Sequence, residues 1–248
     1  MKNILSYAQF RFLKHLFYST LHGSNLRKLA LAYGTDKEGQ HFYAKHYQDH
    51  FSHLRLRKLN LLEIGIGGYE HPDGGGASLR MWKAYFPKAN IVGIDIFDKS
   101  FHDDKRIKTH IGSQTDPVFL KNLVTKISAF DIIIDDGSHV SNDVIASFKI
   151  LFPLLATGGI YIIEDLQTSY WEETVSQEDA GPYILPHLTS MNFLKTLVDG
   201  LNYEEFASDD YSPTYFDKNI TSIHFYHNLV FIYKGDNREG SNILGSRF

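Results

Sequence analysis

The pattern of hydrophobic and polar positions changes character near residue 58. Before it, apolar and aromatic residues recur at helical spacing over residues 4–21, 25–33 and 42–51. After it, short β-branched runs alternate with helical segments. The predicted strands cover residues 59–64, 90–94, 108–111, 130–135 and 159–163, and the predicted helices residues 79–85, 117–127, 141–155 and 191–199. This alternation predicts right-handed βαβ crossovers and a mostly parallel, doubly wound α/β sheet.

The end of the chain departs from this alternation. Two β-rich runs, residues 220–226 and 229–234, are separated only by His227 and Asn228. A connection this short requires an antiparallel pair, because a parallel pair needs a crossover of about a dozen residues or more. We therefore expect a C-terminal hairpin at the edge of the sheet, and a mobile loop or lid over residues 172–182. The predicted organisation is a helical extension, residues 1–57, packed on a single globular domain, residues 58–248.

A glycine-rich turn follows the first predicted strand. Gly65 and Gly67 come directly after the run that ends at Ile64. Glycines allow a sharp turn and a close approach of backbone to a ligand, as in loops that bind nucleoside cofactors. Asp95 closes the second strand, where an acidic side chain can accept hydrogen bonds from ribose hydroxyls. The gap between glycines and acid exceeds the usual spacing, and residues 69–76 account for the excess as an enlarged loop.

Acidic residues close two further strands. Asp135 and Asp136 end one apolar run, and Glu164 and Asp165 end another. Ligands of open α/β sheets bind beyond the carboxyl ends of the strands, and carboxylates gathered there would repel one another without a cation. Oxygen ligands favour Mg²⁺, Ca²⁺ or Mn²⁺ over zinc. Because successive strand residues face opposite sides, we expect one of the paired aspartates to face the cofactor and the other the cation.

Composition narrows the class of partner. The formal charge is −4 with a pI near 6.3, which gives no general footprint for nucleic acid, so small molecules are favoured. The chain has no cysteine and no recognisable secretory signal, which fits the cytoplasm. Arg11, Lys14 and His15 interrupt the first apolar stretch, so we expect no integral membrane segment. That stretch predicts an amphipathic helix that packs on its own domain, joins a sister subunit in a homo-oligomer, or contacts a membrane surface.

Glu63 before the glycines, Asp95 and the terminal hairpin together resemble the class I S-adenosylmethionine-dependent methyltransferases, over roughly residues 58–235. The resemblance implies that the loop with Gly65 and Gly67 lies against the methionine part of the cofactor and that Asp95 binds its ribose. It also implies that the segment after the third strand contacts adenine, with Gln114 as the expected residue.

Within that family, the segments 135–139 and 163–171 resemble the metal-dependent sugar O-methyltransferases that modify macrolide antibiotics, and also the cephalosporin-hydroxylase-like group. The resemblance implies that Asp136, Glu164 and Asp165 bind Mg²⁺ and that His139 is the general base. The segment Tyr33–Lys37 resembles the part of those sugar enzymes that helps to cover the cofactor. The cofactor-binding residues expected on all these grounds are Glu63, Gly65, Gly67, Asp95, Gln114, Asp135 and Lys37.

These features predict a Mg²⁺-dependent transfer of methyl from S-adenosylmethionine to a sugar hydroxyl of a glycosylated natural product or a surface-glycan precursor. One alternative is a catechol-type small-molecule methyltransferase. It is disfavoured because that pattern uses a Lys base and an Asp-Asn pair, where this chain has His139 and Glu164-Asp165. A second alternative is a non-catalytic module that binds S-adenosylmethionine, and a third is a nicotinamide dehydrogenase, which needs neither the cation site nor the hairpin.

Overall fold

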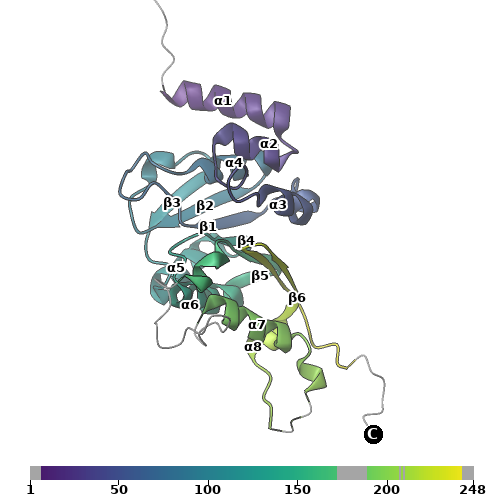
Figure 1. Cartoon of the computed structure of the whole chain (residues 1–248). Coiled ribbons are helices and arrows are strands. Elements are labelled where there is room, and N and C mark those ends of the chain that lie inside the picture. The colour runs from purple at the N-terminus through teal and green to yellow at the C-terminus, as the bar shows by residue number, and fades with distance from the viewer. Residues whose placement is uncertain (1–6, 172–188, 207, 209, 242–248) are drawn as a thin grey trace, which may run out of the picture. The chain divides into compact units, whose positions relative to one another are not determined.

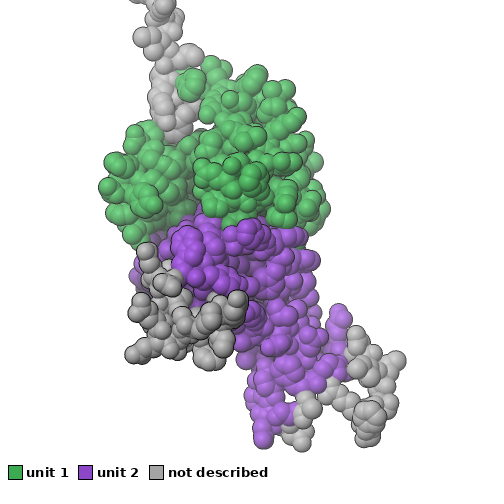
Figure 2. All heavy atoms as spheres, viewed as in Figure 1, with its two compact units in different colours: residues 1–111 green, residues 112–248 purple. Residues whose placement is uncertain are grey.

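A computed structural model describes residues 7–171, 189–206, 208 and 210–241 (Figure 1). Its contacts divide the chain into two compact units, residues 1–111 and 112–248 (Figure 2). The predicted lid, residues 172–182, lies outside the described residues. The predicted division at residues 57 and 58 marks the change from helices to strands within the first unit, and it stays a prediction.

The first unit begins with helices and continues into three parallel strands. The helices are α1 (Tyr7–His22), α2 (Leu26–Tyr33), α3 (Ala44–Phe51), η1 (Ser52–Leu54), α4 (Ala77–Tyr85) and η2 (Ser100–His102), and the strands are β1 (Asn60–Ile64), β2 (Asn90–Asp95) and β3 (Ile107–Ile111). The α2 helix starts where the Asn25 side chain accepts a hydrogen bond from the Lys28 N–H. The strands lie in the order β3-β2-β1, and each neighbouring pair is parallel. The helices and parallel strands predicted for this part of the chain are therefore confirmed.

The second unit combines a parallel strand pair with an antiparallel hairpin. Its helices are α5 (Pro117–Ile127), α6 (Ser141–Leu151), η3 (Phe152–Leu154), η4 (Leu166–Tyr170), α7 (Ser190–Gly200), η7 (Tyr203–Glu205) and α8 (Tyr215–Asn219), and its strands are β4 (Phe130–Asp135), β5 (Leu155–Ile163), β6 (Ile220–Tyr226) and β7 (Leu229–Lys234). The order is β4-β5-β7-β6, parallel between β4 and β5 and antiparallel elsewhere. The predicted hairpin is confirmed, and Asn228 supplies the positive φ of 60° in its turn.

One predicted boundary was wrong. The helix expected over residues 141–155 ends at Leu151, and η3 follows before β5 begins at Leu155. Pro153 explains the difference, because it has no N–H to donate into a continuing α-helix. Leu154 still belongs to η3, and Leu155 begins β5, before the start at Gly159 that the sequence predicted. This strand pairs with β4 and lies next to β7.

The first helix shows its apolar side to the outside of its unit. Side chains of Lys14, His15 and Tyr18 are half-buried and meet α2, where the His15 Nδ1 lies 3.0 Å from the Tyr33 hydroxyl. The large apolar side chains of α1 that are exposed are Phe10, Phe12, Leu13, Leu16, Phe17 and Leu21. The helix itself contacts α2 and α4 of its own unit, but these six side chains lie on its outer side.

The attachment of α1 to α2 should weaken in acid. Burial, then the charges of Lys83 and Arg106, lower the pKa of His15 to about 4, with Asp104 acting in the opposite direction. Between pH 6.5 and about 4 the unfolded chain binds the extra proton at His15, so this contribution to stability is lost as the pH falls. We expect the melting temperature to fall more steeply with acid in the native chain than in His15→Gln, as followed by circular dichroism. Parallel curves for the two proteins would contradict this.

Candidate active site

The turn after β1 is built on Asp95. Its Oδ2 accepts a hydrogen bond from the Ile66 N–H at 3.0 Å, and its Oδ1 accepts one from the Phe97 N–H at 3.0 Å. The Gly65 N–H bonds to the carbonyl of Ile94 at 2.9 Å. The carboxylate therefore fixes the glycine turn to the end of β2, and a carboxylate retains further lone pairs for a ligand. Its predicted contact with ribose stays a prediction.

Lys37 and Glu63 meet in the interior of the first unit. The Lys37 Nζ lies 3.5 Å from the Glu63 Oε1, and both side chains are fully buried. The second carboxylate oxygen of Glu63 accepts a hydrogen bond from the Ser78 hydroxyl at 2.9 Å. The structure thus joins two residues predicted for cofactor binding from segments 26 positions apart in the sequence. A buried pair of this kind is costly to break, because removal of one partner leaves the other charge uncompensated.

The enlarged loop folds back on the glycine turn. The Gly76 N–H bonds to the carbonyl of Ile66 at 2.8 Å, and a Cβ added at Gly75 would lie 2.3 Å from the Gly67 carbonyl oxygen. Lys99, which is buried, donates to the carbonyls of Tyr69 and His71 at 2.6 and 2.8 Å. Sequence reasoning missed Lys99. A lysine shortly after Asp95 is an ordinary surface residue by type, and only the fold shows that it binds the loop.

In the second unit, three candidate groups converge at the ends of β4 and β5. One ligand atom from each of Asp136, His139 and Asp165 lies within 4.8 Å of the others. The His139 Nε2 is 3.9 Å from the Asp136 Oδ1 and 3.7 Å from the Asp165 Oδ2. Glu164, which precedes Asp165 in the sequence, is buried, and its N–H donates to the carbonyl of Asp135 at 3.0 Å. Its carboxylate is not among the three convergent groups.

Two residues of this cluster have unusual backbone conformations. His139 has φ 58° and Asp165 has φ 55°, in the left-handed region where residues other than glycine are uncommon. Such conformations cost roughly 1–3 kcal/mol each and persist where the surroundings hold them. The Thr168 hydroxyl supplies one such restraint, because it donates to the carbonyl of His139 at 2.8 Å. The loop after β4 and the segment after β5 are thus held together at the candidate site.

Behind the cluster, Asp135 lies in a buried polar network. Its Oδ2 accepts hydrogen bonds from the hydroxyls of Ser147 and, at 3.3 Å, Tyr161, and its Oδ1 accepts one from the Gln114 amide at 3.3 Å. Burial raises the pKa of Asp135 to about 6, against hydrogen bonds and the nearby His139 that lower it. Asp135 and Asp136 therefore have different surroundings, as the strand alternation predicted. The predicted contact of Asp135 with the cofactor stays untested.

Gln114 connects that network to the loop that carries the candidate base. Its Oε1 accepts a hydrogen bond from the Ser138 N–H at 2.8 Å, while its Nε2 bonds to Asp135. Both ends of the amide are thus engaged within the protein, and the side chain is buried. Sequence reasoning chose Gln114 for adenine and missed Ser147 and Tyr161. A serine at a buried position of the α6 face and a tyrosine inside an isoleucine-rich strand were the available signals, since buried hydroxyls need partners.

Replacement of Gln114 by leucine should disturb the loop. The Ser138 N–H and Asp135 each lose a partner, and such a loss at a buried site costs roughly 1–3 kcal/mol in the free energy of unfolding. We expect lower turnover with an unchanged dissociation constant for S-adenosylhomocysteine, measured by calorimetry beside the surface control Thr125→Ala. A weakened affinity would instead support the predicted adenine contact, and unchanged turnover would show that the hydrogen bond does not position the loop.

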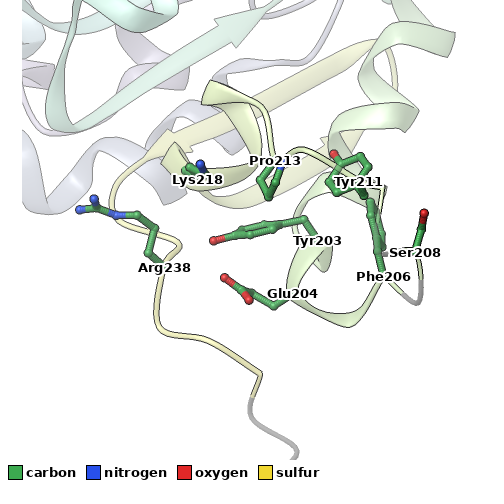
Figure 3. A pocket seen from close by; sticks show the side chains of 8 residues that line it. All are labelled: Tyr203, Glu204, Phe206, Ser208, Tyr211, Pro213, Lys218 and Arg238. Carbon is green, nitrogen blue, oxygen red and sulfur yellow. The ribbon is translucent and has the colours of Figure 1, made fainter. Parts of the chain in front are cut away.

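Two further features of the structure lie apart from the candidate site. A hollow of about 430 Å³ lies elsewhere in the second unit, lined by aromatic and charged side chains that include Tyr203, Tyr211 and Arg238 (Figure 3). It contains none of the residues predicted for cofactor, metal or base. Among the described residues, every helix is too short or too polar to cross a bilayer.

Comparison with known proteins gives close relatives. The chain is 45% identical over 222 residues to mycinamicin VI 2''-O-methyltransferase of Micromonospora griseorubida and 46% identical over 218 residues to demethylmacrocin O-methyltransferase of Streptomyces fradiae. Each match covers 87% of this chain and 54% of the relative. The chain thus spans about half the length of the curated relatives it matches. No family model matches the sequence.

A solved structure shows the same fold. It is the MycE methyltransferase from the mycinamycin biosynthetic pathway, in complex with Mg and SAH, with a TM-score of 0.83 and 43% sequence identity. The match covers 90% of this chain and 58% of that one. A further relative, 46% identical over 213 residues, is 8-demethyl-8-alpha-L-rhamnosyl tetracenomycin-C 2'-O-methyltransferase of Streptomyces olivaceus, of which the match covers 55%.

Proposed function

Since the chain belongs to the S-adenosylmethionine-dependent methyltransferases, we propose that it transfers the methyl group of S-adenosylmethionine to a sugar hydroxyl in a Mg²⁺-dependent reaction. The acceptor is a small glycosylated natural product or a surface-glycan precursor, and the reaction is cytoplasmic. One relative is the 2'-O-methyltransferase of 8-demethyl-8-alpha-L-rhamnosyl tetracenomycin-C, a compound that bears a rhamnosyl sugar, which supports this substrate class.

One observation carries the proposal. Asp136, His139 and Asp165 converge within 4.8 Å at the ends of two parallel strands. The donor set fits a hard divalent cation, since two of the three groups are carboxylates and no thiolate is present in the sequence. In this proposal Asp136, Glu164 and Asp165 hold the ion. When bound, the cation would lower the pKa of a sugar hydroxyl, and S-adenosylmethionine would supply an activated methyl group.

The residues of the chain then have separate duties. The Nε2 of His139 takes the proton of the acceptor hydroxyl, while the hydroxyl oxygen forms its new bond to the methyl carbon as the bond from that carbon to sulfur breaks. The left-handed backbone at residue 139 and the hydrogen bond from Thr168 hold the imidazole beside the two aspartates. In the first unit, Asp95 binds the ribose of the cofactor and the glycine turn lies against its methionine part. The buried pair of Glu63 and Lys37 supports the strand and the segment that surround this turn.

Tyr170 and Trp171 extend the site toward a sugar. Both follow the acidic pair by a few residues and both are exposed, at 57% and 53%. Exposed aromatic faces a few residues after the acidic pair suit stacking on the apolar face of a sugar ring. By its residue type and its place in the sequence, Tyr183 is a third candidate for such stacking, and it lies outside the described residues.

The proposal is tested by incubating the chain with isotopically labelled S-adenosylmethionine, Mg²⁺ and a panel of glycosides, catechols and free sugars. Mass spectrometry should show a labelled methyl ether on a glycoside and none on the catechols. Methylation of a catechol alone would instead favour the catechol-type alternative. Cofactor binding by calorimetry without methylation of any acceptor would favour the non-catalytic module.

A further inference from the structure

The α1 helix has the reverse of the usual arrangement of a surface helix. A helix at the surface of a globular domain normally buries its apolar stripe and shows its polar face to water. In α1, the polar and aromatic side packs on α2, with the Lys14 Nζ 5.8 Å from the centre of the Tyr33 ring. The opposite side carries six large apolar side chains, each 47–65% exposed. A continuous apolar face of this kind marks a binding surface.

Charge gives the nature of the partner. Residues 1–35 contain five Lys and Arg side chains and no Asp or Glu, whereas the remaining residues contain 20 basic and 29 acidic side chains. The apolar helix thus lies in a long, basic and acid-free segment of a chain that is acidic as a whole. Such a segment is attracted to a negative surface. Two copies of the segment placed face to face would bring like charges together, which disfavours a symmetric contact between α1 helices.

We propose that the exposed face of α1 docks on an anionic lipid membrane. The face contains Phe10, Phe12 and Phe17 with three leucines, the residue types that insert at the boundary between headgroups and acyl chains. Its 16 residues correspond to roughly 24 Å of helix, too short for a span and suitable for lying in the plane of the membrane. The polar side of α1 remains attached to α2, so the helix joins the first unit to the lipid surface.

The test uses the whole chain and sedimentation with vesicles. One set is phosphatidylcholine alone, and in the other phosphatidylglycerol replaces part of it. We expect binding to the anionic vesicles, weaker binding to the neutral ones, and a loss of binding as salt is raised. The double variant Phe10→Ser, Phe17→Ser should lower the binding constant about tenfold or more. Val118→Ser is the control, because it removes a 66% exposed apolar side chain from α5.

Other results would overturn the proposal. Failure to bind anionic vesicles at low salt excludes it directly, and equal binding to neutral vesicles removes the electrostatic part on which it rests. Light scattering tests whether the face binds a second copy of the chain instead. If the native chain does not bind vesicles and forms a dimer that the double variant abolishes, the partner is a second copy. Methyl transfer is not part of the readout, so the result is independent of the proposed reaction.

Discussion

Replacement of His139 by alanine should lower methyl transfer about 10²–10⁴-fold, the range that positioned proton transfer contributes. The side chain lies 3.7 Å from Asp165 and 3.9 Å from Asp136, so its removal takes the only imidazole from the convergent cluster of the described residues. The dissociation constant for S-adenosylhomocysteine should stay nearly the same, because the predicted cofactor residues of the first unit are untouched. Turnover is measured by labelled methyl transfer and affinity by calorimetry.

A second variant separates the side chain from the backbone. Residue 139 has φ 58°, which asparagine adopts more readily than most residues. His139→Asn therefore preserves the loop better than alanine does while removing the base. Both variants should be equally inactive if proton transfer matters. Full activity in either variant would contradict the assignment of His139 as the general base. A large loss of Mg²⁺ affinity in both variants would indicate that His139 is a metal ligand instead.

Asp136→Asn and Asp165→Asn should shift the Mg²⁺ requirement of the reaction. A neutral amide oxygen holds a hard dication more weakly than a carboxylate does, and even residues outside the ligand shell change metal affinity 10–100-fold. We expect at least that increase in the Mg²⁺ concentration for half-maximal activity, with part of the rate recovered at high Mg²⁺. Glu164→Gln should behave in the same way if its carboxylate is a ligand.

The matched control for these variants is Asp199→Asn, an exposed acid of α7 in the same unit. It makes the same chemical change outside the convergent cluster and should leave the Mg²⁺ dependence unchanged. A Glu164→Gln protein with native Mg²⁺ dependence would show that Glu164, which stands apart from the three convergent groups, has a structural role. Native dependence in all three variants would remove the metal site from the account.

Among the described residues, the pattern of the sequence was sufficient for strands β1 to β7 and helices α1 to α7, but it did not predict α8 or the short 3-10 helices. Period and turn residues located β1 to β7, because buried parallel strands are short apolar runs and the two-residue connection at His227 leaves one topology. The failure at the end of α6 has a local cause. The apolar run continues through Pro153 without a change of composition, so periodicity alone could not separate the last turn of the helix from the first residues of β5.

The sequence predicted only part of the site. It located the acidic residues but not the hydrogen-bond partners of the side chains. Strand ends place Asp136 and Asp165 at the same edge, which follows from parallel pairing. The partners of a side chain do not follow from its position in a strand. Nothing in the sequence indicates that the Gln114 amide bridges Asp135 and the Ser138 N–H, or that Lys99 binds the loop carbonyls, because these contacts join segments distant in the chain.

The outward apolar face of α1 is a third case. The sequence predicted an amphipathic helix correctly. The pattern alone, however, does not show which face of the helix packs against the rest of its unit. The contact between His15 and Tyr33 decides the matter, since it turns the polar side of the helix inward. Hydrophobic pattern therefore predicts that a face will be buried, and only the fold shows whether the same unit buries it.

The central claim is that one divalent cation binds among the acids that follow β4 and β5. Its most direct test is calorimetric titration of Mg²⁺ into the chelator-treated chain with S-adenosylhomocysteine present, in parallel with Asp136→Asn. One binding event per chain in the native protein, lost or greatly weakened in the variant, is the predicted result. No binding in the native protein, or an isotherm that the substitution leaves unchanged, would contradict the account.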